Sequence, residues 1–571
     1  MSERKLDRRE LMGLATGAAA LSAAPGVAGA LLQNPTKKPA RTEFPNRGSA
    51  LSGPGVPLPT KVVPTRSGPI QGLVENGIHT FRGVRYGAAP IGKLRFMPPQ
   101  PPEPWTSRLD ATDYGAPAMQ LASGATASDF GLQMNRVFTT PSELKVMNED
   151  CLYLNVWTPG TDTKKRPVMV WLHGGGFASG SGSQPIYQGD GLAKFGDVVV
   201  ISVNHRLNVF GYLYLGELMG DDYASSGTVG MQDLVLALRW IRDNIEAFGG
   251  DPGNVMIMGQ SGGGSKVSVL CAMPSAKGLF HKAAIQSGSG LTVGRKAQAT
   301  ASARRLLDAL GVKPGDRAAL EAIPAQTILA VAAKLYGGMG GVGPGDGPII
   351  DEIVLPRDPF MPDAPEVSAD VPFLVGWTKD EQTIFQASEP WYGTLTEAEL
   401  QARVKPMGEN GQKLLAAFRK AYPSYSPTFL WIQLISVRKM QGAELVGEHK
   451  AALGRAPAYV YRISWETPVA DGLYRSPHTI EIPFMLYSFD KVRTFVGPGA
   501  GPRRMADQMA GAWVAFARTG KPDHPGIPHW PAFNPGARPV MDFNLTSKVI
   551  NDPLPEVRQV LSSMTSLAPR G

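Results

Sequence analysis

One pentapeptide, Gly259-Gln260-Ser261-Gly262-Gly263, constrains the fold of this chain more than any other feature. It follows an apolar run at residues 255–258, which indicates a buried strand. It precedes residues 265–273, which lack proline and indicate a helix. A Gly-x-Ser-x-Gly sequence between strand and helix makes a sharp turn that lifts the serine hydroxyl above the sheet edge. The glycines suit a strained backbone and a close approach of helix to strand. The alternative is a chance match in a Gly-rich loop, because the chain has 66 glycines. The pattern of the surrounding sequence distinguishes the two.

Strands and helices alternate through the rest of the chain. Short strands are indicated at residues 69–72 and 78–84, and apolar strands at residues 152–157, 167–172, 198–203, 283–286, 373–376 and 459–463. Apolar residues recur at helical spacing from Met231 to Ile245, and further helical patterns occupy residues 299–311, 317–335 and 397–421. This alternation predicts an α/β fold with a large, mostly parallel central sheet covered by helices on both faces. The last three helical segments are expected to form an inserted upper layer.

Two irregular segments interrupt this pattern. Residues 115–148 show no firm period, and a stretch of that length in a compact domain is usually a lid or a binding loop. Residues 337–347 hold seven glycines and are expected to form a mobile loop.

Charge and cysteine content exclude some classes of function. The formal net charge is +8, and residues 1–59 hold eight Lys and Arg against four Asp and Glu. The remaining charge is too dilute for a nucleic-acid interface, and no aromatic-basic motif supports one. No Cys/His cluster has metal-ligand spacing, so we expect no metal and no cofactor. The two cysteines, Cys151 and Cys271, are expected to be free buried thiols rather than a disulfide.

The N-terminal segment has the composition of an export signal. Arg8-Arg9 precedes an uncharged stretch rich in Ala, Gly and Leu, and Ala28-Gly29-Ala30 has the form of a cleavage site. The paired arginines resemble the twin-arginine type that bacteria use to export folded proteins. We therefore expect residues 1–30 to be an export signal, 31–59 a Pro/Gly-rich linker and 60–565 a single domain. The mature protein would be periplasmic or secreted without a stable membrane span; an uncleaved membrane anchor is the alternative.

Separated sequence blocks resemble the type B carboxylesterase/lipase family, the cholinesterase-like branch of the α/β-hydrolase superfamily. The match is specific because many blocks occur in the right order over roughly residues 62–545. The blocks are residues 81–84, 149–156, 173–177, 204–207, 248–252, 259–263, 286–288, 380–381, 513–517 and 530–531. The resemblance implies an α/β-hydrolase fold and a secreted bacterial serine carboxylesterase that acts on small-molecule esters.

Acyl transfer at a serine needs a nucleophile, a base, an orienting acid and a site for the oxyanion. Ser261 is the candidate nucleophile, and the order Ser, acid, His is expected for this fold. His478 is the candidate base, because it follows a predicted strand late in the chain and lies in a His-x-x-Glu-x-x-Phe setting similar to that of the family. The resemblance implies Glu381 as the acid, with Asp380 as the rival.

The resemblance also assigns residues around the triad. It implies that the backbone N–H groups of Gly175, Gly176 and Gly262 form the oxyanion hole, and that His173 orients this loop. In relatives, a serine at the position of Ser287 hydrogen-bonds the catalytic glutamate; a plain serine at a strand end is the alternative.

Departures from the family limit the choice of substrate. Residue 260 is Gln where many relatives have Glu, and residue 262 is Gly where many have Ala. Residues 106–156 contain no Trp to hold a quaternary ammonium group, so an uncharged or anionic ester is expected rather than a choline ester. An amidase or thioesterase with the same triad, or a non-catalytic binding module, remains as an alternative function. The oligomeric state stays open.

Overall fold

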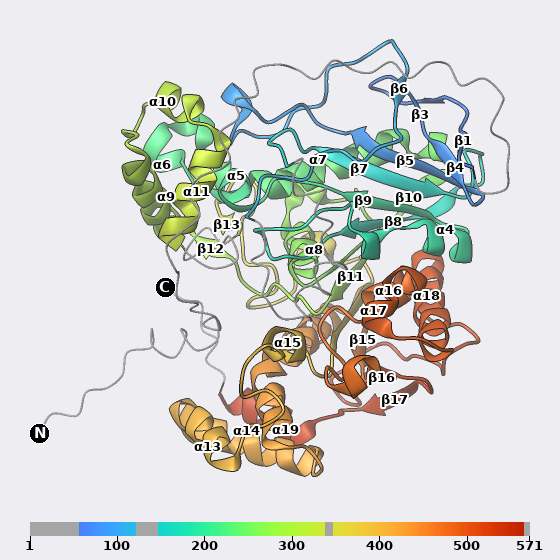
Figure 1. Cartoon of the computed structure of the whole chain (residues 1–571), viewed down its shortest axis with the longest axis vertical. Helices are drawn as coiled ribbons and strands as arrows, with labels where there is room; N and C mark the ends of the chain where they lie inside the picture. The colour runs from blue at the N-terminus through green and yellow to red at the C-terminus, as the bar shows by residue number, and fades with distance from the viewer. Residues whose placement is uncertain (1–55, 122–146, 337–346, 565–571) are drawn as a thin grey trace, which may run out of the picture.

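The computed structural model describes residues 56–121, 147–336 and 347–564 (Figure 1). The predicted export signal at residues 1–30 lies outside the described residues, as does most of the predicted linker at 31–59. The central parts of the two irregular segments, 115–148 and 337–347, lie outside them as well.

A sheet of 12 strands runs through the described part of the chain. Its middle strands, from β9 to β16, pair in parallel, whereas the strands from β1 to β7 and the last strand, β17, pair antiparallel. The mostly parallel sheet confirms the predicted fold class. In spatial order the strands are β1 (Leu58–Pro59), β4 (Leu73–Glu75), β5 (Ile78–Arg85), β7 (Tyr153–Thr158), β9 (Val199–Val203), β8 (Arg166–Leu172), β10 (Gly250–Gln260), β11 (Lys282–Gln286), β14 (Phe373–Thr378), β15 (Ala458–Ile463), β16 (Pro539–Phe543) and β17 (Lys548–Asn551).

Both faces of the sheet are buried under helices. Successive side chains of a strand point to opposite faces, and in β10 Val255 and Ile257 join one apolar cluster while Met256 and Met258 join the other. This two-sided burial explains why the central strands are apolar throughout. The helices that supply side chains to the first cluster include α7 (Val229–Asn244), α8 (Gly262–Ala272) and α15 (Pro427–Leu453). Those that supply the second include α4 (Asp190–Gly196), α16 (Ile482–Met485) and α18 (Gly501–Thr519).

The inserted helical segments are present as two groups, which Figure 1 shows at opposite ends of the molecule. Each predicted segment from 317–335 and 397–421 is divided near a proline, Pro324 or Pro406, because proline cannot continue the backbone hydrogen bonds of a helix. The first group contains α6 (Gly216–Met219), α9 (Lys296–Leu310), α10 (Arg317–Ala322) and α11 (Ala325–Tyr336), which share an apolar cluster of their own. The second contains α13 (Glu397–Val404), α14 (Gly408–Ala421) and α19 (Pro555–Ser563).

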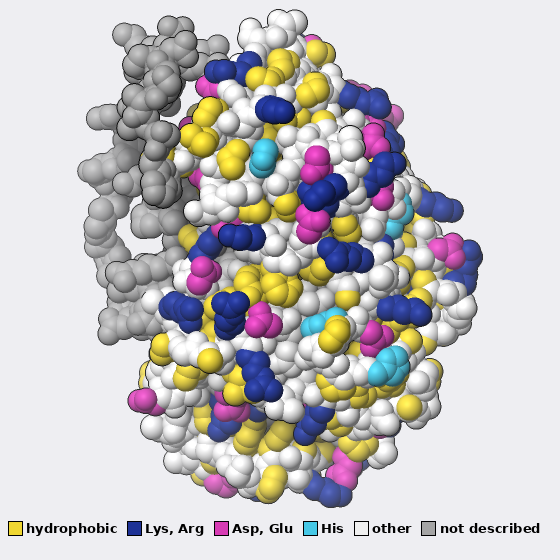
Figure 2. Space-filling view, turned by 90° about the vertical axis from the view of Figure 1, so that its right-hand side faces the viewer, with side chains coloured by type: hydrophobic (Ala, Val, Ile, Leu, Met, Phe, Trp, Pro, Cys, Tyr) yellow, Lys and Arg dark blue, Asp and Glu magenta, His cyan; other side chains and the backbone are white. Residues whose placement is uncertain are grey.

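Cys151 and Cys271 are both free and buried, as expected from the sequence. None of the described helices is long and apolar enough to cross a membrane. Figure 2 shows Lys and Arg side chains interspersed with Asp and Glu over one face of the molecule.

Candidate active site

Ser261 occupies a strained turn between β10 and α8. Its backbone has φ 59° and ψ −124°, and α8 begins at the next residue. The N–H of Ser261 donates to the carbonyl of Gln286 at the end of β11, at 2.8 Å. A Cβ added to Gly263 would lie 2.0 Å from the carbonyl oxygen of Leu172 in β8, which leaves no room for a side chain. The helix therefore starts in direct backbone contact with the sheet, and the turn adopts the shape expected from the sequence.

The predicted oxyanion glycines lie together beside this turn. Gly175 and Gly176 follow β8 in the left-handed region, with φ 85° and 62°. A Cβ added to Gly262 would lie 2.2 Å from Gly176 O, so the loop after β8 lies against the first residue of α8. Within the described residues, the N–H groups of Gly175 and Gly176 have no hydrogen-bond acceptor, and that of Gly262 is at a helix N-terminus. Free N–H groups in this arrangement suit a developing negative charge.

Glu381 and His478 form a buried pair in the loops that follow two neighbouring strands, β14 and β15. His478 Nδ1–H donates to Glu381 Oε2, while Glu381 Oε1 accepts the N–H of Thr378 at 2.8 Å. Burial alone would raise the pKa of Glu381, but the charge of His478 and these two hydrogen bonds hold it below its usual value. Glu381 is thus an ionised partner that fixes the histidine ring.

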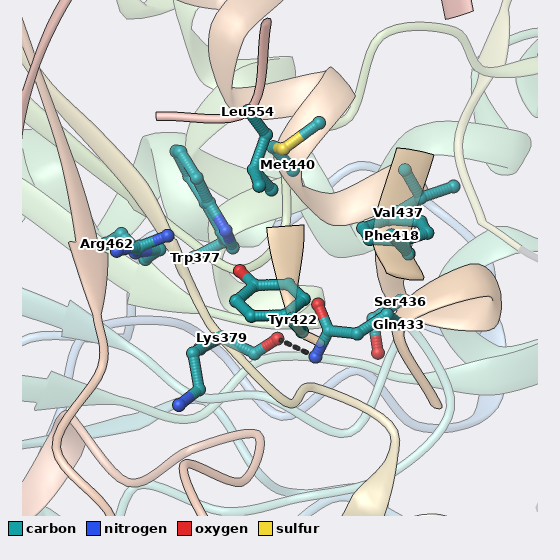
Figure 3. Close-up of a pocket in the computed structure, with 10 residues that line it drawn as sticks. All are labelled: Trp377, Lys379, Phe418, Tyr422, Gln433, Ser436, Val437, Met440, Arg462 and Leu554. Carbon is teal, nitrogen blue, oxygen red and sulfur yellow. Dashed lines mark hydrogen bonds between the residues drawn. The ribbon is translucent and has the colours of Figure 1, made fainter. Parts of the chain in front are cut away.

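Asp380, the rival acid, has no hydrogen bond to His478 within the described residues and instead binds Ser476 and Gln433. Its N–H donates to Ser476 O at 3.0 Å, and its carboxylate accepts the N–H of Ser476 at 3.3 Å. Gln433 of α15 donates to Asp380 Oδ1 at 2.8 Å and to Lys379 O at 3.1 Å. Figure 3 shows this glutamine beside a cavity of about 10 Å³ that also contacts Trp377. Burial raises the pKa of Asp380 to about 6. The structure therefore favours Glu381 as the orienting acid.

Ser287 does not contact the expected carboxylate. Its hydroxyl donates to Glu481 Oε1 at 3.1 Å, so the expectation that it hydrogen-bonds Glu381 is wrong. Both oxygens of Glu381 have other donors, His478 Nδ1 and the N–H of Thr378. Burial and the charge of neighbouring Glu381 raise the pKa of Glu481 to about 8. The sequence signal that could have placed Glu481 at the site was its spacing from His478, which it follows by three residues.

Gln260, the residue before the nucleophile, contacts the histidine. Its Nε2 lies 3.2 Å from His478 Nε2 and 3.3 Å from His478 Nδ1, so the amide approaches both ring nitrogens. The side chain that departs from the family pattern is therefore a direct neighbour of the candidate base, and it is uncharged.

Sequence reasoning missed one buried charge beside the glycine loop. Lys266 of α8 is fully buried, and its ammonium donates to His173 O at 2.9 Å. His173 in turn contacts Gly174 O through Nδ1 at 2.9 Å, which agrees with a role in orienting the loop. Its ring stacks on His205 at 4.9 Å, and burial together with Lys266 lowers its pKa well below the usual value. The only sequence signal for Lys266 was a lone cation in an otherwise uncharged helix.

Comparisons with known proteins agree with this geometry. The profile of the Carboxylesterase family matches residues 59–561. Para-nitrobenzyl esterase of Bacillus subtilis (strain 168) is 33% identical over 512 residues, which cover 88% of this chain and 98% of that protein. The crystal structure of the Geobacillus stearothermophilus carboxylesterase at pH 6.2 has a TM-score of 0.75 and 37% identity, covering 88% of this chain and 100% of that one.

A third similar protein is an esterase from anaerobic Clostridium hathewayi that can hydrolyse aliphatic aromatic polyesters. Its structure has a TM-score of 0.74 and 31% identity, and the match covers 90% of this chain and 100% of that one. The family match spans the strands, the serine turn and the acid–base pair described above. The chain therefore belongs to the carboxylesterase family, has the α/β-hydrolase fold and is a carboxylic ester hydrolase.

Proposed function

We propose that the protein hydrolyses esters through an acyl-Ser261 intermediate, with His478 as general base and Glu381 as the orienting acid. The observation that carries this proposal is the buried Glu381–His478 pair at the same sheet edge as the strained Ser261 turn. A serine hydroxyl is a weak nucleophile at neutral pH, so it needs a base that removes its proton during attack.

In the first half-reaction, Ser261 Oγ attacks the ester carbonyl carbon while His478 Nε2 takes the hydroxyl proton. The negative charge that develops on the carbonyl oxygen is bound by the N–H groups of Gly175, Gly176 and Gly262. His478 then returns the proton to the leaving alkoxide, and the alcohol departs. In the second half-reaction, His478 activates a water that attacks the acyl group and releases the carboxylic acid and Ser261.

Glu381 acts without accepting the proton. Its carboxylate keeps the Nδ1–H tautomer of His478, which leaves Nε2 unprotonated as the base, and it stabilises the imidazolium that forms during attack. The depressed pKa of Glu381 keeps it ionised at neutral pH, as this role requires.

The substrate class that fits the site best is a small, uncharged ester. Gln260 brings an uncharged amide to the face of His478, where a carboxylate would favour a cationic group. The Phe385 ring lies 5.3 Å from the His478 ring and is 45% exposed, so an apolar surface borders the base. Relatives named for a para-nitrobenzyl ester and for aliphatic aromatic polyesters support uncharged esters with apolar groups.

The same proposal includes export from the cytoplasm, with residues 1–30 as the signal. The support is the paired arginines, the uncharged stretch and the small-residue cleavage site in the sequence. Expression of the full chain in a bacterium with and without a functional twin-arginine system tests this part. Processed protein in the periplasm only when that system works is the expected result.

Hydrolysis of p-nitrophenyl acetate and butyrate by the wild type and by Ser261→Ala tests the chemistry, together with a fluorophosphonate label mapped by mass spectrometry. We expect the label on Ser261 and loss of nearly all activity in the variant. Activity that persists in Ser261→Ala would contradict the proposed nucleophile. Comparing p-nitrophenyl butyrate with butyrylcholine and the anilide of butyrate tests the preference for an uncharged ester, and faster turnover of the cationic ester or the anilide would contradict it.

A further inference from the structure

Lys266 is a buried cation beneath the oxyanion loop, and the mechanism above does not use it. It lies on α8, the helix that begins directly after Ser261, and none of its surface is exposed. Its Nζ donates to the carbonyl of His173, the residue just before the three glycines, at 2.9 Å. The same Nζ lies 5.8 Å from the ring centroid of Phe177, the residue just after them. The ammonium therefore lies close to the residues on both sides of the three glycines 174–176.

No carboxylate compensates this charge. Among the described residues, the only hydrogen bond of Nζ is to the His173 carbonyl, and no acidic side chain lies within ion-pair distance. A buried ammonium without an anionic partner is costly, because burial favours the neutral amine. Burial accordingly lowers the pKa of Lys266 to about 7.

The ionisable groups around Lys266 are neutral or already paired. The rings of His173 and His205 stack on each other, and burial together with the charge of Lys266 lowers the pKa of both well below the usual value. Arg206 is neutralised by Asp233, with 2.6 Å between Nη2 and Oδ1. The Tyr187 hydroxyl, near Gly174, has its pKa raised by burial and is neutral. The field of the ammonium is thus uncompensated in the free enzyme.

A tetrahedral intermediate would change this balance. The oxyanion forms at the N–H groups of Gly175 and Gly176, which belong to the loop that Lys266 holds. An anion there meets the positive charge of Lys266, which is itself buried away from water, and electrostatic interactions of a buried charge are strong. The interaction exists in the transition state and not in the free enzyme, which is the condition for faster chemistry.

We propose that Lys266 is a positioning residue of the oxyanion loop, holding the His173–Gly174 backbone in place and adding a positive charge that only the transition state neutralises. This inference rests on the proposed acyl-Ser261 mechanism. It assigns to Lys266 a part in the reaction without contact with the substrate, acting through the backbone of the loop and through its charge.

The test compares the pH dependence of kcat/KM for p-nitrophenyl acetate in the wild type, Lys266→Met and Lys266→Arg. The ammonium is present below pH 7 and is lost as the pH rises through about 7, so wild-type kcat/KM should fall there by about tenfold. Lys266→Met should show the lower plateau at every pH, with the loss mainly in kcat. Lys266→Arg, which stays charged, should lack the fall above pH 7.

Lys450 provides a matched control. It is also fully buried, and among the residues that the structure describes its ammonium donates only to the backbone carbonyls of Ser368 and Ala369, at 3.0 and 2.9 Å. Burial lowers its pKa to about 8, as for Lys266, but it lies on α15 away from the glycine loop. Lys450→Met should leave the pH profile of kcat/KM unchanged, and a matching change in this variant would overturn the inference.

Stability separates an electrostatic role from a merely structural one. The unfolded chain binds the Lys266 proton up to a pKa near 10.5, while the folded protein releases it near 7, so this group raises stability as the pH rises between these values. Lys266→Met should therefore be at least as stable as the wild type at pH 6 in urea unfolding, although it is slower. A variant that is both slow and clearly less stable at pH 6 would indicate a structural lysine and overturn the inference.

Fluorophosphonate labelling of Ser261 is measured first in every variant. Absence of label in the wild type would contradict the proposed mechanism itself. A labelled wild type together with a Lys266→Met variant of unchanged kcat/KM would overturn the Lys266 inference alone. If Lys266→Met does not fold, the comparison of wild type with Lys266→Arg above pH 7 decides, and a fall that persists in the arginine variant overturns the inference.

Discussion

Replacing Gly262 by alanine, the residue that many relatives have here, tests whether the oxyanion loop of this chain depends on the close approach that glycine allows. The added Cβ would lie 2.2 Å from Gly176 O, 2.4 Å from Gly176 Cα and 2.5 Å from Gly176 N. All three contacts are with backbone, so no side-chain rotation relieves them. Ordinary contact begins near 3.4 Å, so the Gly176 peptide must move away by about 1 Å.

A displacement of this size should slow the chemistry far more than it weakens substrate binding. Moving a catalytic group by about 1 Å costs on the order of 10²-fold, and losing one oxyanion donor costs about 10²–10³-fold. We therefore expect kcat of Gly262→Ala to fall about 10²-fold, or about 3 kcal/mol in activation free energy, with little change in KM. The strain of displacing the loop should also lower the free energy of unfolding, by about 1–3 kcal/mol.

The assay is kcat and KM for p-nitrophenyl butyrate, with urea unfolding to verify the fold. Gly264→Ala is the matched control, because it adds a methyl group to the same helix and its closest contacts, at 3.1 Å, are with Gln286 O and Gly288 Cα rather than with the oxyanion loop. It should lose much less activity. A Gly262→Ala variant with wild-type kcat would refute the reasoning, since the loop would then not depend on its contact with residue 262.

Three further predictions follow from the buried charges. Glu381→Gln should lower kcat by on the order of 10³-fold or more, because the histidine tautomer is lost, whereas Asp380→Asn should lose less; equal losses would contradict the assignment of the acid. The raised pKa of Glu481, about 8 against an ordinary 4.5, means that the folded protein binds more protons than the unfolded chain between these values. Wild-type stability should therefore fall relative to Glu481→Gln as pH rises from about 4.5 to 8 in urea titrations, and a constant difference would refute this. Asp233→Ala should cost about 3–5 kcal/mol in the free energy of unfolding, because it leaves Arg206 buried and unpaired; a loss below about 1 kcal/mol would contradict that reading.

Much of the fold was predictable because a strand that is buried on both faces needs apolar residues at consecutive positions. The run at residues 255–258 is apolar at every position, since Val255 and Ile257 serve one apolar cluster and Met256 and Met258 the other. The division of the later helical segments was not predicted, although Pro324 and Pro406 lie inside the patterns. Helical periodicity continues across a break when both pieces bury the same side, so the pattern alone does not reveal it.

The site was predictable where local geometry restricts residue type and unpredictable where long-range contacts decide. Ser261 and the glycine loop need unusual backbone angles, which leave a sequence signature. The Ser287 hydroxyl donates to Glu481, 194 residues away, and not to Glu381, and only the folded structure decides between two such distant carboxylates. In the sequence Lys266 is indistinguishable from an ordinary surface lysine of a helix, and only its hydrogen bond to His173, in the loop after β8, indicates otherwise.

The distribution of the site along the chain has a consequence for biosynthesis. The strained serine turn and its glycine loop belong to the first half of the sequence. His478, which contacts Gln260 of that turn, comes 218 residues after Gln260. At a ribosome rate of about 5–20 residues per second, the base emerges roughly 10–40 s after the nucleophile. During that interval the nascent chain holds a serine without its base, so the enzyme stays inactive until translation is nearly complete.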